Sequence, residues 1–99
     1  MARLRDKTVA YVLISTEVGM VQSVASAVAN MDPVYRAIVL TGPYDVLADV
    51  WVANNHELGT VVLQIHQIDG VIDTQTSVVT WAFGDGGKQI DAVTNGPPF

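Results

Sequence analysis

Two different spacings of apolar residues run along the chain, and the change between them separates strands from helices. Short runs rich in β-branched and aromatic residues predict strands, and they cover residues 8–15, 34–41, 45–52 and 71–83. Two other stretches repeat apolar residues at intervals of three and four, as amphipathic helices do, and they cover 20–31 and 54–68. The predicted order is strand, helix, strand, strand, helix, strand.

Residues at the segment ends agree with these boundaries. Pro33 stops the first helix, and Gly42 stands in the short turn that joins two strands into a hairpin. Asn54 is followed three residues later by Glu57, the spacing of a capping box at a helix start. Gly70 then ends the second helix. The sequence therefore sets most element boundaries without reference to distant contacts.

This order predicts the α+β class with a ferredoxin-like βαββαβ fold, a four-stranded antiparallel sheet with both helices on one face. The strand at 8–15 is apolar on both sides, because Val9 and Tyr11 alternate with Ala10 and Val12. A sheet that is apolar on both faces must bury both. Sixteen tail residues are too few to cover a whole face, so we expect a second copy to do so, giving a homodimer of the dimeric α/β barrel type.

Composition places these elements in one domain. The chain has 99 residues, of which 49% are hydrophobic and only 15% charged. We expect a domain over residues 1–83 and a Gly/Pro-containing tail over 84–99, an arm onto a neighbouring subunit or a lid near a site. Trp81 and Phe83 are expected to pack on another subunit or on the tail.

Charge and residue usage exclude several functions. A net charge of −5 with five basic residues argues against nucleic-acid binding by this chain alone. The absence of cysteine excludes disulfides and thiolate chemistry and fits a cytoplasmic location, which we expect. No apolar run approaches the ~20 residues that span a membrane, so no membrane partner is expected. His56 and His66 are too far apart for a helical metal pair, and neither a metal nor a cofactor is expected.

Three stretches resemble one protein family: 10–19 (AYVLISTEVG), 40–47 (LTGPYDVL) and 68–79 (IDGVIDTQTSVV). In this order they are similar to the ligand-binding domain of the Lrp/AsnC transcriptional regulators, also called the regulation of amino-acid metabolism (RAM) domain. The resemblance covers about residues 9–79. It implies dimers that pair through the sheet and assemble into octamer-like or decamer-like rings, with amino-acid effectors bound between neighbouring dimers.

Full-length members of that family carry an N-terminal DNA-binding helix-turn-helix. Only seven residues precede the first predicted strand, too few for such a domain. The chain therefore resembles the stand-alone members, and we expect effector sensing and assembly, with DNA contact absent or supplied by a full-length regulator as partner.

The resemblance also implies an effector site, built from the turn between the second and third strands and from the fourth strand. Its positions here are Thr41, Gly42, Tyr44, Asp45, Thr74 and Thr76. An amino-acid zwitterion needs a carboxylate acceptor and an array of N–H or hydroxyl donors. Asp45 fits the ammonium, and backbone N–H groups around Gly42 and Tyr44 fit the carboxylate. Thr74 and Thr76 are two apart and share one strand face.

Each of these residues also has a plainer role. Gly42 serves any hairpin turn, and an Asp at the position of Asp45 commonly bonds neighbouring backbone N–H groups. Tyr44 fits a packing aromatic at a subunit contact, and Thr74 and Thr76 fit ordinary exposed strand positions.

Three other functions stay open beside the sensor. They are a small dimeric α/β barrel enzyme of the monooxygenase or isomerase type, a ligand-free assembly partner, and an amino-acid-binding ACT domain. No catalytic residue is predicted, because Asp49 and Glu57 have no second carboxylate at a suitable spacing. We expect Asp49 to face a charged or polar neighbour across the dimer.

Overall fold

The six predicted elements are present in the predicted order. The computed structural model describes residues 2–84, 86–90 and 92–93. Its main elements are β2 (Thr8–Thr16), α1 (Val21–Ala29), β3 (Val34–Val39), β4 (Val46–Val52), α2 (Asn55–His66) and β5 (Val71–Val78). The bounds lie within a few residues of the predicted ones, except for the last strand.

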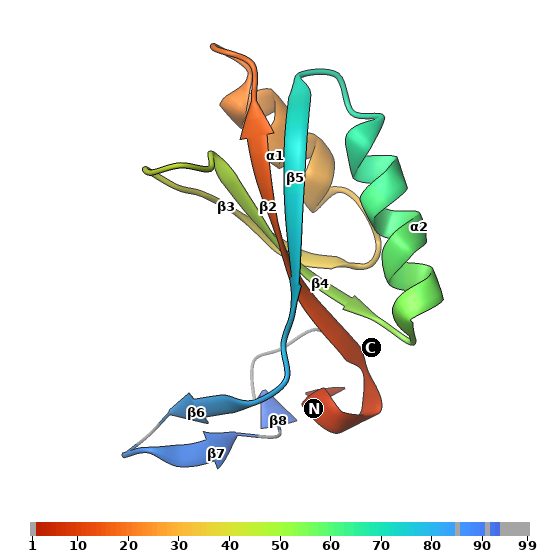
Figure 1. Ribbon diagram of the computed structural model, residues 1–99, viewed down its shortest axis with the longest axis vertical. Helices are drawn as coiled ribbons and strands as arrows, with labels where there is room; N and C mark the ends of the chain where they lie inside the picture. Colours follow the sequence, from red (N-terminus) through yellow and green to blue (C-terminus); the bar gives the residue numbers. More distant parts are fainter. Residues whose placement is uncertain (1, 85, 91, 94–99) are drawn as a thin grey trace.

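The main strands form one antiparallel sheet in the order β3-β4-β2-β5 (Figure 1). The predicted ferredoxin-like fold is therefore confirmed. Strand β2 lies in the interior of the sheet, where Leu13 is opposite Leu47 of β4 on one side and Gln75 of β5 on the other. Strands β3 and β5 are the two edges, and β5 begins beside the end of β2 that leads into α1.

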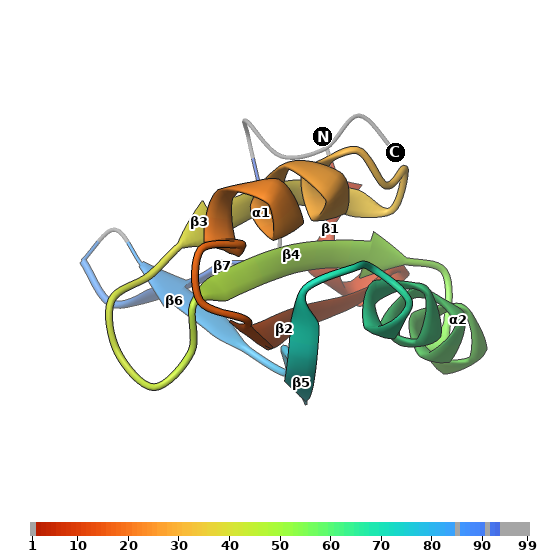
Figure 2. The ribbon, with the colours of Figure 1, turned by 90° about the horizontal axis from the view of Figure 1, so that it is seen from above.

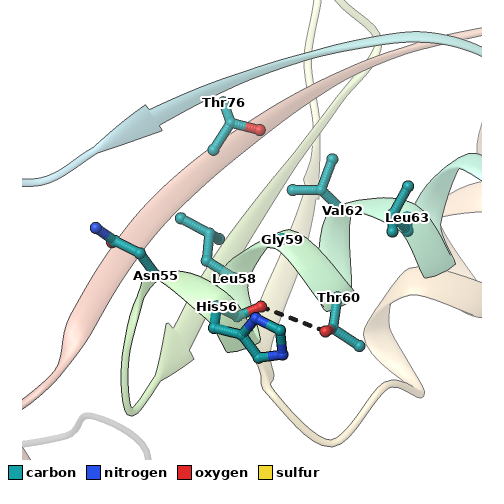
Figure 3. Close-up of a pocket in the computed structure, with 8 residues that line it drawn as sticks. All are labelled: Asn55, His56, Leu58, Gly59, Thr60, Val62, Leu63 and Thr76. Atoms are coloured by element: carbon teal, nitrogen blue, oxygen red, sulfur yellow. Dashed lines mark hydrogen bonds between the residues drawn. The ribbon is translucent and has the colours of Figure 1, made fainter.

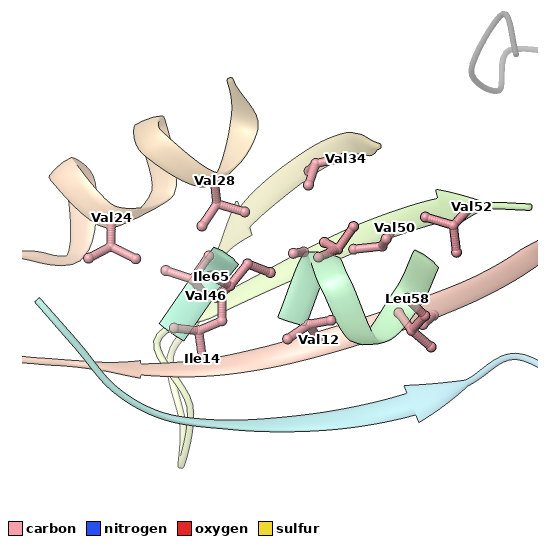
Figure 4. Packing of buried hydrophobic residues seen from close by; sticks show 13 residues of the cluster. Val12, Ile14, Val24, Val28, Val34, Val46, Val50, Val52, Leu58 and Ile65 are labelled. Atoms are coloured by element: carbon pink, nitrogen blue, oxygen red, sulfur yellow. The ribbon is translucent and has the colours of Figure 1, made fainter. Parts of the chain in front are cut away.

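Both helices pack on the same face of the sheet, as predicted. Alternate residues of β2 and β4 point into this layer, and Figure 4 shows them between the sheet and the helices. Fully buried members include Val12, Ile14, Val24, Val28, Val46, Val50 and Ile65. Figure 2 shows α1 over the β3–β4 side, whereas α2 lies toward β5. Neither helix has the length and apolar character needed to cross a membrane, nor does any other helix within the described ranges.

The predicted strand at 71–83 is wrong as one element. Strand β5 ends at Val78, and a separate hairpin of β6 (Ala82–Gly84) and β7 (Lys88–Ile90) follows. The Val79 N–H still donates to the Val9 oxygen at 2.8 Å, but β2 begins only one residue earlier. Beyond that bond the strand has no partner left, so the chain turns away (Figure 1).

The predicted tail at 84–99 falls partly outside the described residues. Gly84 belongs to β6, and β8 (Ala92–Val93) pairs with β1 (Ala2–Arg3) near a short 3-10 turn, η1 (Leu4–Asp6). Residues 85, 91 and 94–99 are not described. The boundary after residue 83 stays a prediction, as does the role of the tail as an arm or a lid.

The face of the sheet away from the helices is called the open face below. Its residues include Val9, Tyr11, Leu13, Arg36, Ile38, Leu47, Asp49, Trp51, Gln75 and Ser77. One end of it is covered within the chain, contrary to expectation, because Leu4, Tyr35 and Val79 pack on buried Val9 and Trp51. Toward the middle Tyr11 and Ile38 stay 41% and 37% exposed.

The start of α2 has the predicted capping box. Asn54 Oδ1 accepts the Glu57 N–H at 2.9 Å, and Glu57 Oε2 accepts a backbone N–H at 3.0 Å. The second donor is Ala53, one residue before the cap. The first bond satisfies a backbone donor that the first helical turn leaves without a partner, and the second fixes the chain just before the helix.

We expect Asn54→Ala to lower the free energy of unfolding by about 1 kcal/mol, because the Glu57 N–H loses its acceptor. Urea unfolding of the variant and the parent protein measures this difference. Asn55→Ala is the matched control, since Asn55 is an exposed neighbour that caps nothing. Equal losses in the two variants would contradict the assigned cap.

Candidate functional site

The 40–45 loop, which joins β3 to β4, is tied down at one end of the sheet. Within the loop, the Leu40 N–H donates to the Asp45 carbonyl oxygen at 2.8 Å. The Asp45 N–H donates to the Ile14 oxygen of β2 at 2.9 Å. These bonds close the loop and fix its base on the central strand, so its tip is presented from a rigid support.

The Asp45 side chain adds a second anchor. Its Oδ2 accepts the Thr16 N–H at 2.8 Å and the Thr16 hydroxyl at 3.3 Å. Thr16 is buried, and a charged acceptor makes stronger hydrogen bonds than a neutral one. The carboxylate therefore has the plainer backbone-binding role. Within the part of the chain that the structure describes, Oδ1 takes no hydrogen bond and stays available.

Tyr44 reaches from the loop to the far edge of the sheet. Its hydroxyl donates to Gln75 Oε1 of β5 at 2.7 Å, across the end of β2. Gln75 was not among the predicted site residues. Its pairing with Leu13 places it on the open face, a position that depends on the register of β5 and leaves no local signal in the sequence.

Thr74 and Thr76 share one strand face, as predicted, but that face is turned toward the helices. They lie opposite Ile14 and Val12, both of which point into the core. The Thr74 hydroxyl lies 2.7 Å from His66 Nε2 of α2. The two threonine side chains therefore lie on the helix side of β5, whereas Tyr44 contacts β5 on its open face. A single protomer does not gather all six predicted residues into one pocket.

Thr41 and Gly42 form the exposed tip of the loop. Gly42 has a φ of +139°, which favours glycine, and a Cβ there would meet nothing within 4 Å. The glycine is thus required by the backbone conformation and not by crowding. Its N–H lies at an accessible tip where a ligand from solvent could approach the backbone.

A broad apolar groove lies between α2 and β5, with a volume of about 650 Å³. Figure 3 shows Thr76 across from Leu58 and Val62, with His56 and Thr60 toward the outside. Thr76 is the one predicted site residue in its lining. Helical spacing placed Leu58 and Val62 on the apolar face of α2, but the groove itself depends on how far α2 stands from the sheet edge.

Asp49 is a buried carboxylate on the open face, only 4% exposed. Trp51 Nε1 donates to its Oδ1 at 2.9 Å, and Arg36 Nε lies 3.4 Å from its Oδ2. Burial raises the pKa of Asp49, while the Trp51 bond and the Arg36 charge act in the opposite direction. These polar partners belong to its own chain, and a further neighbour across the dimer stays an expectation.

Among residues 2–84, 86–90 and 92–93, no three His, Asp or Glu side chains are arranged to hold a metal ion. His56 and His66 are both exposed on α2, as expected for surface residues.

Comparisons with known proteins agree on one family. The model of the Lrp/AsnC ligand binding domain matches residues 9–87. TTHA0845 from Thermus thermophilus is 34% identical, with a TM-score of 0.73 over 79% of this chain and 99% of that one. No curated protein sequence matches.

Two more distant solved structures share the fold. E. coli AsnC is 23% identical with a TM-score of 0.70, over 77% of this chain and 52% of that one. The transcriptional regulator NMB0573 of Neisseria meningitidis, solved as an L-Met complex, is 21% identical with a TM-score of 0.67, over 89% and 57%.

We expect Arg36→Ala to lower stability at pH 7, and the loss to shrink as the pH falls toward about 4. The variant removes the cation beside Asp49, so the folded-state pKa of Asp49 rises further above its unfolded value of about 3.9. The ionised Asp49 carboxylate then lowers the stability of the folded state, and protonation of Asp49 removes this loss. Urea unfolding at both pH values measures it.

Arg36→Lys keeps the positive charge and serves as the control for this pH dependence. An equal loss for Arg36→Ala at both pH values would show that the guanidinium acts through packing and not through the Asp49 charge.

Proposed function

Because the chain belongs to the family of Lrp/AsnC ligand-binding domains, we propose that it is an amino-acid effector-binding and oligomerisation domain. The family supplies transcriptional regulators, so the proposed activity is binding and not catalysis. The L-Met complex of NMB0573 supports an amino acid as the class of effector. Its low identity to this chain leaves the side chain of that effector open.

The observation that carries this proposal is the double anchorage of the 40–45 loop. Asp45 binds Thr16 at the end of β2, and Tyr44 binds Gln75 of β5. A loop that is already ordered loses little conformational entropy when a ligand binds to it. The same anchorage leaves Asp45 Oδ1 for an ammonium group and the backbone at Gly42 for a carboxylate.

The effector site is proposed to be completed by a second protomer. Thr41 and Gly42 are exposed and Asp45 is partly buried, whereas a bound amino acid is usually buried over most of its surface. A neighbouring copy would supply the missing wall. Thr74 and Thr76 are on the helix side of β5. They would then contact an effector only from the helix side of the boundary between the two protomers.

The open face is proposed as the surface that pairs two protomers. Tyr11 and Ile38 are partly exposed there, and Leu13 and Leu47 are only half-buried. These side chains surround the Asp49–Arg36 pair, which already satisfies its own charges. A second copy can therefore bury the apolar area without leaving an unpaired ion at the interface.

We also propose that the domain acts beside a DNA-binding regulator of the same family, in mixed assemblies that use the open face. The matched part of E. coli AsnC is 52% of that chain, so this domain corresponds to about half of such a protein. The match covers 99% of TTHA0845, so nearly the whole length of that solved relative corresponds to this domain.

An amino-acid effector should raise the thermal midpoint of unfolding, followed by Trp51 and Trp81 fluorescence. Binding to the folded state at one hundred times the Kd adds about 2.7 kcal/mol, a rise of several degrees for a domain of this size. The measurement screens the twenty amino acids at millimolar concentration. A selective rise supports the sensor, and no rise with any of them argues for a ligand-free assembly partner.

Asp45→Asn should remove this effector-induced rise while preserving the fold. Asparagine keeps an oxygen acceptor for Thr16 but lacks the negative charge that an ammonium group requires. Asp45→Ala should also lower the free energy of unfolding by about 1–3 kcal/mol, because the buried Thr16 donors lose their partner. Asp69→Asn is the control, because it removes the charge of an exposed aspartate in the loop before β5. Undiminished binding by Asp45→Asn would refute the assigned role.

Ile38→Glu should break the open-face contact and lower the mass of the assembly, because it places a charge in the apolar centre of that face. Val39→Glu is the matched control: Val39 is the next residue, is 54% exposed, and points to the helix side of the sheet. Sedimentation velocity measures both. If the assembly tolerated Ile38→Glu but not Val39→Glu, the contact between protomers would lie on the helix side of the sheet and not on the open face.

A further inference from the structure

Strand β5 has a free edge. It pairs with β2 on one side, and among the described residues no strand pairs with the other side. The Val79 N–H donates to β2, and residues of an antiparallel strand alternate in direction. The unbroken register from Val78 back to Asp73 therefore directs the N–H and C=O groups of Thr74, Thr76 and Val78 toward the free edge.

This edge lacks most of the devices that keep strands from pairing with other chains. Natural edges carry proline, lysine or other charges, or are very short. Strand β5 has eight residues, no proline and one charged side chain, Asp73. Apolar side chains are exposed beside it: Ile72 is 61%, Val78 49% and Leu63 of α2 67% exposed. The edge is thus suited to accept another strand.

Residues at equal distances from Gln75 in β5 are similar in kind, and one pair, Thr74 and Thr76, is identical. Thr74 and Thr76 are equidistant from the centre, as are Asp73 and Ser77, and Ile72 and Val78. We propose that two copies of this chain pair antiparallel through their β5 edges, with the two-fold axis at Gln75. The partner is therefore a second copy, and the surface is self-complementary as a two-fold contact requires.

The geometry of the ladder agrees with this centre. Thr74 of one copy lies opposite Thr76 of the other, and both direct their backbone groups outward, so they form hydrogen-bonded pairs. Gln75 faces its own copy in a non-hydrogen-bonded pair. Asp73 meets the Ser77 hydroxyl and Ile72 meets Val78, and such matched cross-strand pairs stabilise sheets.

Other centres match less well. An axis at Asp73 would set two carboxylates directly opposite each other, which destabilises a pair of strands. An axis at Thr74 would place Ile72 opposite Thr76 and Asp73 opposite Gln75. Only the axis at Gln75 pairs threonine with threonine and apolar with apolar along the whole edge.

The groove between α2 and β5 opens beside this edge. Thr76 lines it together with Val62 and the exposed Leu63 (Figure 3). Pairing at the edge brings the α2 helix of each copy to the same side of the joined sheet. The second copy thus covers apolar surface that a lone protomer leaves in water, which adds to the backbone hydrogen bonds.

The edge contact goes beyond the proposed function and does not depend on an effector. It uses backbone groups of β5, whereas the pairing proposed above uses side chains of the open face. A protomer with two different two-fold contacts links dimers into a larger assembly, which is a ring with an even number of copies where the two axes allow closure.

A cysteine at the axis tests the pairing directly, because the chain has no cysteine of its own. In Gln75→Cys the two Cα atoms would lie about 4.5 Å apart, within the range for a disulfide. In Ser77→Cys the two sulfurs would be offset by four residues, roughly 13 Å along the strands. Mild oxidation should give a covalent dimer for Gln75→Cys and none for Ser77→Cys, and the reverse result or no crosslink overturns the pairing.

Thr76→Pro in the Gln75→Cys background separates edge pairing from contact between open faces. Proline removes an N–H that points outward and leaves the bonds to β2 intact. The crosslink should fall at least tenfold, whereas Thr76→Val, which keeps the N–H, should retain it. Ile38→Glu should retain it as well, since that variant breaks only the open-face contact. A crosslink unchanged by Thr76→Pro overturns the proposal.

Hydrogen exchange of the unmodified protein gives a second measurement that needs no variant. The Thr74 and Thr76 amides face water in a lone chain and should exchange rapidly in dilute solution. Pairing should slow them as the protein concentration rises, while Gln75, whose amide faces β2, is protected throughout. Rapid exchange of both threonine amides at all concentrations overturns the proposal.

Discussion

The sheet has two apolar faces and the chain has helices for only one of them. Val12 and Ile14 point into a dry layer of valine, leucine and isoleucine side chains that α1 and α2 complete. Truncation of such a buried side chain to alanine costs about 2–5 kcal/mol, so this layer holds the fold. Tyr11 and Leu13 alternate with the same residues and must face the other way. The proposal that a second copy covers the open face rests on that alternation.

The proposed effector site depends on how the 40–45 loop is tied to this sheet. Asp45 uses one oxygen to bind Thr16, a structural role that an alanine variant would disturb together with any binding. The asparagine variant separates the two because it changes charge while preserving an acceptor. One carboxylate can therefore anchor a loop through one oxygen and bind a ligand through the other, provided that the two oxygens face different partners.

Local signals in the sequence predicted what local interactions decide. The strands, both helices and the Asn54–Glu57 cap follow from spacing within a few residues. The division of 71–83 at Val78 could not be predicted that way, because it reflects where β2 begins. Gln75 was missed for the same reason. The Arg36 partner of Asp49 was not predicted, since nothing in the sequence shows that Arg36 lies opposite it across the hairpin.

Gln75 connects the 40–45 loop to the β5 edge. Its side chain accepts from Tyr44 of the 40–45 loop, and its backbone is the proposed axis of the β5 contact. A ligand that competes for the Tyr44 hydroxyl or the Gln75 amide would act on the strand at that axis. Coupling between two binding events is reciprocal, so an effector that favours the edge-paired state must bind more tightly to the assembly than to the protomer. The affinity for an effector should then rise with protein concentration.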